Sequence, residues 1–147
     1  MSEGYVTGIF VKRAHGGPMD SRPEAMLEAG RGLAGSADVG GRRQVTLLSH
    51  ERWAELMREV GATLGAEARR ANIVLSGIDL ENTRGRTLVI GGCRLRIGGE
   101  TRPCELMEEA AAGLQSAMRE HWGGGAFAEV VVGGQITVGD AVRWDSL

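Results

Sequence analysis

Paired glycines divide this chain into short segments, and this division restricts the possible folds more than any other feature of the sequence. The 147 residues include 24 glycines, about twice the usual share of roughly 7%. Most of them stand in pairs or in a triplet: Gly16-Gly17, Gly40-Gly41, Gly91-Gly92, Gly98-Gly99, Gly123-Gly124-Gly125 and Gly133-Gly134. Their spread along the chain predicts tight turns between short strands rather than a flexible linker.

The segments between these turns are rich in β-branched and alternating apolar residues, which is typical of strands. We predict strands at 5–12, 44–48, 72–76, 87–90, 94–97, 126–132, 135–138 and 141–144. The pairs Gly91-Gly92 and Gly133-Gly134 predict hairpins between the strands that flank them. Segment 15–37 is predicted to be mostly loop, and such a long loop in a compact domain is often a binding or lid segment.

Two segments have apolar residues at helical spacing. The first follows Ser49, a residue type that caps helices, and ends at Gly61. Its apolar side consists of Trp53, Leu56, Met57 and Val60. The second runs over 105–122 and ends at the triple glycine. Antiparallel strands joined by glycine turns favour a closed sheet. We therefore predict a mainly β fold, a β-barrel of about seven strands with two main helices.

The length of the chain and its net charge limit the classes of protein to which it can belong. A chain of 147 residues fits one domain with a core over about 4–144. The net charge of −2 gives no reason to expect nucleic acid, and the apolar runs are too short for a membrane span. The N-terminus does not resemble a signal peptide, and two cysteines do not make a disulfide framework. We therefore expect a cytoplasmic protein.

The basic residues are almost all arginine, since Lys12 is the one lysine among 17 Lys and Arg residues. Arginine suits bidentate contact with phosphate or carboxylate, so the bias is compatible with an anionic ligand. A GC-rich genome that favours arginine codons explains the bias equally well.

Cys104 is the strongest candidate for chemistry. It follows Pro103, a residue type favoured in the first turn of a helix, so it is expected near the positive end of a helix dipole. Arg102 beside it also favours the thiolate, the form that attacks sulfur donors or binds metal. Glutamates at 105, 108 and 109 oppose ionisation if they point the same way. A buried structural cysteine is the alternative.

Other candidates are weaker. Arg70 and Asn72 precede a predicted strand, where a guanidinium fork and an amide can hold a phosphate or the edge of a pterin. The alternative places Arg69 and Arg70 on a solvated surface and makes Asn72 a turn residue. Arg43 is a candidate of the same kind. Cys93 lies in the predicted hairpin, after Gly92 and before a strand, and is interpreted as a small core or turn residue. Its spacing to Cys104 matches neither a redox pair nor a zinc site, and a dithiol relay would need the fold to bring the two together.

Several blocks, in order, resemble the MOSC domain, the C-terminal domain of molybdenum cofactor sulfurases. They are 43–49 (RQVTLLS), 70–80 (RANIVLSGIDL), 101–104 (TRPC) and 133–142 (GGQITVGDAV). The chain is identified on these residues as a stand-alone member, for which a MOSC-type β-barrel is expected. The family often has Gly-Leu-x-Gly-Asp near its start, whereas here Ser36 follows Gly35 and the nearest acid is Asp38. The role of that acid is therefore in doubt.

The resemblance implies that Cys104 carries sulfur as a persulfide or ligates molybdenum. It also implies a molybdenum cofactor site that includes Arg43, Arg70, Asn72, Thr101 and Arg102. The expected partners are a cysteine desulfurase or a molybdoenzyme. Pyridoxal phosphate, which full-length sulfurases use, needs a lysine Schiff base. Lys12 lies in a predicted strand, so this cofactor would be on the partner desulfurase.

The sequence leaves three functions open. The protein could be a sulfur carrier, or a molybdenum-dependent reductase of N-hydroxylated compounds. It could also be a non-catalytic ligand-binding or interaction module that retains the barrel.

Overall fold

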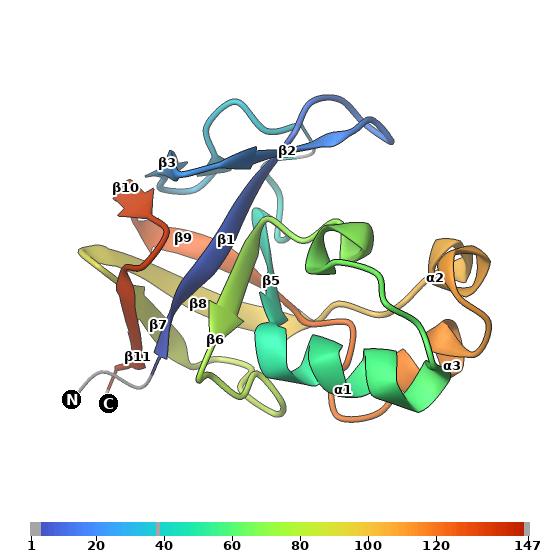
Figure 1. Cartoon of the computed structure of the whole chain (residues 1–147). Helices are drawn as coiled ribbons and strands as arrows, with labels where there is room; N and C mark the ends of the chain where they lie inside the picture. Colours follow the sequence, from blue (N-terminus) through green and yellow to red (C-terminus); the bar gives the residue numbers. More distant parts are fainter. Residues whose placement is uncertain (1–3, 38, 146–147) are drawn as a thin grey trace.

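The computed structural model describes residues 4–37 and 39–145, so Asp38 lies outside the described residues. Figure 1 shows a curved sheet with the helices gathered beside one end of it. The strands are β1 (Gly4–Lys12), β2 (Met19–Arg22), β3 (Glu24–Glu28), β4 (Gly32–Leu33), β5 (Val45–Ser49), β6 (Ile73–Ser76), β7 (Thr87–Ile90), β8 (Cys93–Glu100), β9 (Ala126–Val132), β10 (Gly134–Thr137) and β11 (Ala141–Trp144). The helices are α1 (His50–Val60), the 3-10 helix η1 (Ala66–Arg69), α2 (Glu105–Ala110) and α3 (Leu114–Met118).

Seven strands close into a barrel in the order β11-β7-β8-β9-β5-β6-β1. Closure depends on the pairing of β1 with β11, where Gly4 lies opposite Val142 and Tyr5 opposite Ala141. Strand β2 continues the sheet beyond β1. The predicted mainly β barrel of about seven strands is therefore confirmed.

Alternate side chains of the strands fill the barrel. On β8, Cys93, Leu95 and Ile97 are buried while the residues between them are not, as the two-residue period of a strand requires. Burial of each large aliphatic side chain contributes about 1.5–3 kcal/mol. A second core forms between the barrel and the helices, from Leu48, Trp53, Leu56, Met57, Ala71, Val74, Met107, Leu114 and Met118.

Helix α1 has the predicted bounds and caps. The Ser49 hydroxyl accepts a 3.2 Å hydrogen bond from the Arg52 backbone N–H, and Gly61 ends the helix with φ 71°. The helix returns the chain to the starting end of the sheet, so β5 and β6 are parallel, with Leu48 opposite Val74. The antiparallel pairing expected of strands joined by tight glycine turns does not apply to this pair, because helices link the two strands. A parallel pair brings the starts of two strands together, and this arrangement positions the site.

The structure differs from two predictions about strands. Segment 15–37 contains three strands that were not predicted, β2, β3 and β4, although about half of its residues lie outside strands. The expected hairpin at Gly133-Gly134 does not form, since β10 pairs with β3 in a separate sheet of order β10-β3-β4. Pairing across the chain overrides the weak strand propensity of β3, whose sequence is EAMLE.

The predicted helix over 105–122 is two short helices, α2 and α3. Gly113 separates them with φ 83°, a left-handed conformation that suits glycine. Met107, Leu114 and Met118 are buried as the apolar pattern indicated, but Leu106 is 56% exposed. No helix within the described ranges is long and apolar enough to cross a membrane.

Candidate functional site

Five predicted site residues line one cavity of about 380 Å³, which we call the Cys104 pocket. They are Arg43, Arg70, Asn72, Thr101 and Cys104. Thr46 near the start of β5 and Asn72 just before β6 also place this pocket at the starting end of the parallel pair. Arg102 is exposed and is not among the described residues that line it. The fold thus brings together segments that are far apart in the sequence.

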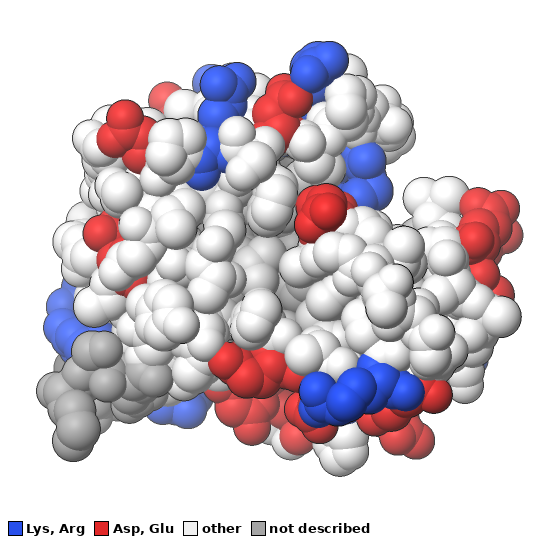
Figure 2. Space-filling view, in the orientation of Figure 1, with Lys and Arg blue, Asp and Glu red and all other residues white. Residues whose placement is uncertain are grey.

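Cys104 is exposed at the N-cap of α2, with φ −115° and ψ 176°. The alternative of a buried structural cysteine is therefore wrong. The glutamates at 105, 108 and 109 are exposed and do not line the pocket. Figure 2 shows acidic side chains over the outer side of α2. With only six residues in α2 and acids in its first turn, the helix dipole contributes little positive potential.

Arginine side chains supply the positive charge near Cys104 instead. Arg69 lies close enough to Cys104 and Arg43 to interact electrostatically with both. Burial lowers the pKa of Arg69, while the charge of Cys104 raises that pKa and the charge of Arg43 lowers it. The cysteine therefore faces a guanidinium that is largely withdrawn from solvent, where charge interactions are less screened.

Arg69 also holds the segment that carries Cys104. Its Nε donates a 3.0 Å hydrogen bond to the carbonyl of Gly124, and its Nη2 makes longer bonds to the carbonyls of Thr101, at 3.5 Å, and Arg102, at 3.4 Å. Sequence reasoning missed this role, because a basic pair before a strand also fits a solvated surface. The triple glycine was a sequence signal that two segments pack closely here. Gly124 lies so near the segment that carries Cys104 that a Cβ at this position would overlap the Thr101 carbonyl oxygen.

Two residues that line the pocket each have a buried polar atom without a hydrogen-bond partner among the described residues. These atoms are Nη2 of Arg70 and Oγ1 of Thr101. Arg70 follows η1 with φ 66°, and Thr101 is 5% exposed. An unsatisfied buried polar group costs about 1–3 kcal/mol. An anion bound in the pocket would give both groups an acceptor.

The side chain of Asn72 joins three strands at the inner end of the pocket. Its Oδ1 accepts hydrogen bonds from the backbone N–H and the hydroxyl of Thr46, at 3.1 and 3.2 Å. Its Nδ2 donates to the carbonyl of Phe10 at 3.2 Å. These bonds account for most of the hydrogen-bonding capacity of the amide. The structure shows that Asn72 holds the strands in position. Contact between Asn72 and a ligand stays a prediction.

The remaining basic side chains lie around the pocket. The exposed Arg43 guanidinium is 5.7 Å from the centroid of the Phe127 ring, a cation–π distance. Lys12 and His15 also line the pocket. His15 belongs to the segment expected to be a binding loop, and that segment therefore reaches the site although it also contains three short strands.

Cys93 has a structural role, as predicted. It is 1% exposed in the barrel core, and burial raises the pKa of its thiol, with the charge of Asp140 acting in the same direction. Cys104 is therefore the accessible thiol of the protein.

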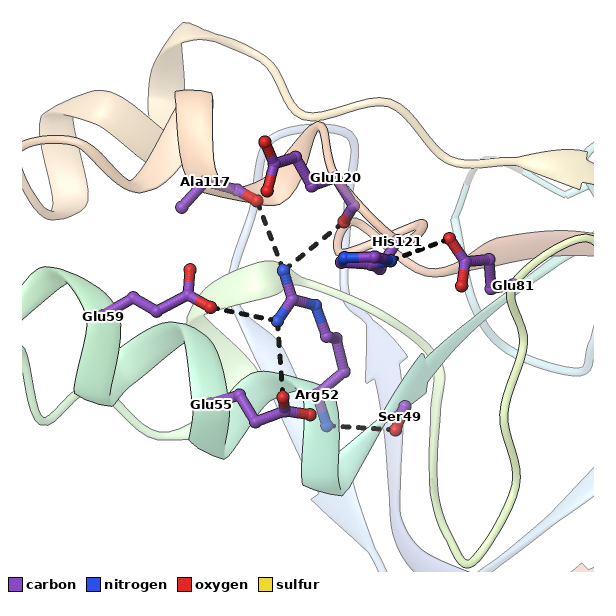
Figure 3. A network of polar contacts seen from close by, with 8 residues as sticks. All are labelled: Ser49, Arg52, Glu55, Glu59, Glu81, Ala117, Glu120 and His121. Carbon is purple, nitrogen blue, oxygen red and sulfur yellow. Dashed lines mark hydrogen bonds and ion pairs between the residues drawn. The ribbon is translucent and has the colours of Figure 1, made fainter.

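A larger cavity of about 570 Å³ lies at the opposite end of the parallel pair, where Ser49 and Gly77 line it. Figure 3 shows that Arg52 and His121, two of its lining residues, contact nearby carboxylates. Arg52 contacts the carboxylates of Glu59 and Glu55 at 3.3 and 3.7 Å, and Nδ1 of His121 is 3.0 Å from Glu81. None of the predicted site residues lines this cavity, so we do not assign the chemistry to it.

The described part of the chain contains no group of three or more His, Cys, Asp or Glu side chains that could hold a metal ion.

Comparison with known proteins supports the fold and the family. A family model described as the MOSC domain matches residues 12–143. The crystal structure of the YuaD protein from Bacillus subtilis is 21% identical, with a TM-score of 0.78, and the match covers 95% of this chain and 93% of that one. YiiM from Escherichia coli is 17% identical with a TM-score of 0.73, and the match covers 97% and 70% of the two chains.

YiiM from Geobacillus stearothermophilus is 15% identical with a TM-score of 0.72, over 99% of this chain and 75% of that chain. Identities this low support the fold alone. No curated protein matches the chain. The family match covers most of the chain, including strands β5 to β9 and the segment with Cys104, and the chain therefore belongs to the MOSC domain family.

Proposed function

We propose that this protein carries sulfur on Cys104 in sulfur and molybdenum-cofactor metabolism. One observation supports this most directly: the accessible thiol lies at a pocket lined by Arg43, Arg69 and Arg70. A thiolate is the form of cysteine that attacks sulfur donors, and nearby guanidinium groups stabilise it and the persulfide anion that follows.

The proposed transfer needs no external oxidant or reductant. The Cys104 thiolate attacks the outer sulfur of a persulfide on a donor protein. A new sulfur–sulfur bond forms on Cys104, the donor's bond breaks, and the donor cysteine leaves as a thiolate. The donor we propose is a cysteine desulfurase, which would hold the pyridoxal phosphate. We place this exchange in the cytoplasm, where thiols stay reduced.

Mass spectrometry tests the proposal. After incubation with a cysteine desulfurase and cysteine, the Cys104 peptide should gain the mass of one sulfur atom, and reductant should remove it. The Cys104→Ser variant should gain none. An unmodified Cys104 peptide under conditions that load a known sulfur acceptor would contradict the proposal. Full cellular function in Cys104→Ser would instead support a non-catalytic binding module.

The second candidate is a site for the molybdenum cofactor, with which the MOSC family is generally associated. The residues fit this group. The unpaired donors of Arg70 and Thr101 suit a phosphate, and thiolate is a plausible ligand for molybdenum. In this proposal Arg70 and Thr101 hold the phosphate, Arg43 adds positive charge at the rim, and Asn72 keeps the strands in place. The bound metal would supply the electron transfer for reduction of an N-hydroxylated compound.

Elemental analysis separates this candidate from the first. Protein purified from a host that makes the cofactor should contain molybdenum, and Cys104→Ala should remove it. Arg70→Gln should lower the metal content, whereas the exposed Arg42→Gln should not, because Arg42 does not line the pocket. Unchanged metal content in Cys104→Ala would exclude Cys104 as the ligand.

A further inference from the structure

We propose that a small anion of the thiosulfate class loads Cys104 directly, without a donor protein. This inference rests on the proposed sulfur-carrier function and names a substrate for the same site. In such compounds a sulfane sulfur is bonded to a sulfonate group, so the reactive sulfur arrives attached to an oxyanion.

The charge of the Cys104 pocket favours an anionic donor. Among the described residues that line it are Arg43, Arg69 and Arg70, and none of these described lining residues is an aspartate or glutamate. The larger cavity differs, since Glu51, Glu55, Asp79 and Glu81 line it. A cleft lined by one sign of charge raises the local concentration of ions of the opposite sign. Small anions are therefore drawn to the cavity that contains the accessible thiol.

The unpaired donors supply a place for the oxyanion. Thr101 is 5% exposed with no partner for its hydroxyl, and Nη2 of Arg70 also has none among the described groups. The oxygens of a sulfonate can accept from both, as charge-assisted hydrogen bonds. Thr101 belongs to the segment that leads to Cys104, and Arg69 fixes this segment through the Thr101 and Arg102 carbonyls. A sulfonate held by Thr101 therefore lies on the side of the pocket that carries the thiol.

The volume of the Cys104 pocket is larger than a small anionic donor needs. The pocket measures about 380 Å³, and Leu106 and Met107 form part of its lining. Space beyond the anion is available for the acceptor that later removes the sulfur. Leu106 is 56% exposed. A small anion can enter such a pocket without a docking surface for a protein donor.

The chemistry balances without a further reagent. The Cys104 thiolate attacks the sulfane sulfur, and a new sulfur–sulfur bond forms on the protein. The bond between the sulfane sulfur and the sulfonate breaks, and its electron pair leaves with the sulfonate as sulfite. Two negative charges enter on thiosulfate and two leave on sulfite, so Cys104 carries one negative charge before and after. Cyanide can then attack the persulfide, which releases thiocyanate and restores the thiolate.

The test uses the purified full chain with thiosulfate alone, and then with thiosulfate and cyanide. We expect one sulfite released per Cys104 that gains sulfur, and repeated thiocyanate formation once cyanide is added. Arg70→Gln should raise the KM for thiosulfate about tenfold or more, because it removes a charge-assisted hydrogen bond. Arg42→Gln is the matched control and should resemble the unmodified protein, since Arg42 is exposed and outside the pocket lining.

The outcomes separate the two proposals. If a desulfurase loads Cys104 and thiosulfate does not, the direct-loading inference is wrong and the sulfur-carrier function stands. If neither reagent loads Cys104, the sulfur-carrier function itself fails. Equal KM values for Arg70→Gln, Arg42→Gln and the unmodified protein would show ordinary thiol reactivity, and would overturn the role assigned to the pocket.

Discussion

Arg69 links the two loops that frame the reactive sulfur, through its hydrogen bonds to the Gly124, Thr101 and Arg102 carbonyls. We predict that Arg69→Gln lowers the free energy of unfolding by about 1–3 kcal/mol, because it leaves the partly buried Gly124 and Thr101 carbonyls without this donor. The same variant should slow sulfur loading, and Arg69→Lys should restore part of the rate by returning the positive charge. Urea unfolding and persulfide formation measure the two effects. Equal loading by Arg69→Gln and Arg69→Lys would contradict an electrostatic role.

The second cysteine allows a prediction about pH. Burial raises the pKa of the Cys93 thiol above its unfolded value of about 8.5. The folded state therefore keeps the proton that the unfolded state releases, so this contribution to stability is present below that pH and lost as pH rises towards the folded pKa. Unfolding free energies between about pH 7 and 10 should decline less steeply for Cys93→Ala than for the unmodified protein. Identical slopes would show that Cys93 does not contribute.

At the scale of elements, the triple-glycine turn approaches the segment before Cys104 closely. A Cβ at Gly124 would overlap the Thr101 carbonyl oxygen, whereas a Cβ at Gly92 meets nothing within 4 Å. We predict that Gly124→Ala destabilises the protein by about 1–3 kcal/mol and slows sulfur loading, because the Cys104 segment must shift. Gly92→Ala should change stability by less than about 0.5 kcal/mol. Thermal unfolding of both variants checks this, and equal melting temperatures would contradict it.

The elements also show how far sequence reasoning can reach. Local patterns predicted β1, α1 and the β7–β8 hairpin, because strand alternation, the Ser49 cap and paired glycines act within a few residues. The pairing of β10 with β3 joins residues more than a hundred positions apart, such as Gln135 and Met26, and leaves no local signal. The break at Gly113 was hidden because the apolar spacing continues across it.

The residues of the site could be predicted from the sequence about as well as the strands and helices. Family motifs indicated Cys104, Arg43, Arg70, Asn72 and Thr101, and the structure places all of them at one pocket. Arg69 was missed because its partners are carbonyls, and a backbone carbonyl has no residue type to recognise. Arg102 was included because of its position beside Cys104, but its side chain is exposed outside the pocket lining.

At the scale of the whole molecule, the parallel strands β5 and β6 separate two cavities of different charge. The Cys104 pocket at their starting end has a basic lining, and the larger cavity at their other end contains Glu51, Glu55, Asp79 and Glu81. Figure 2 shows acidic side chains along the lower edge, near α1. We predict that iodoacetate, an anion, alkylates Cys104 faster relative to neutral iodoacetamide than it alkylates a cysteine in an unfolded peptide. A ratio equal to that of the peptide would show that the pocket does not attract anions.

The most direct test of the account is the sulfur content of the Cys104 peptide after the native protein meets a sulfane-sulfur donor. Desulfurase with cysteine, and thiosulfate alone, are the two donors to compare. We predict one reducible sulfur atom on Cys104 and none on Cys93. A Cys104 that stays a plain thiol with both donors, while a known acceptor is loaded in the same experiment, would contradict it.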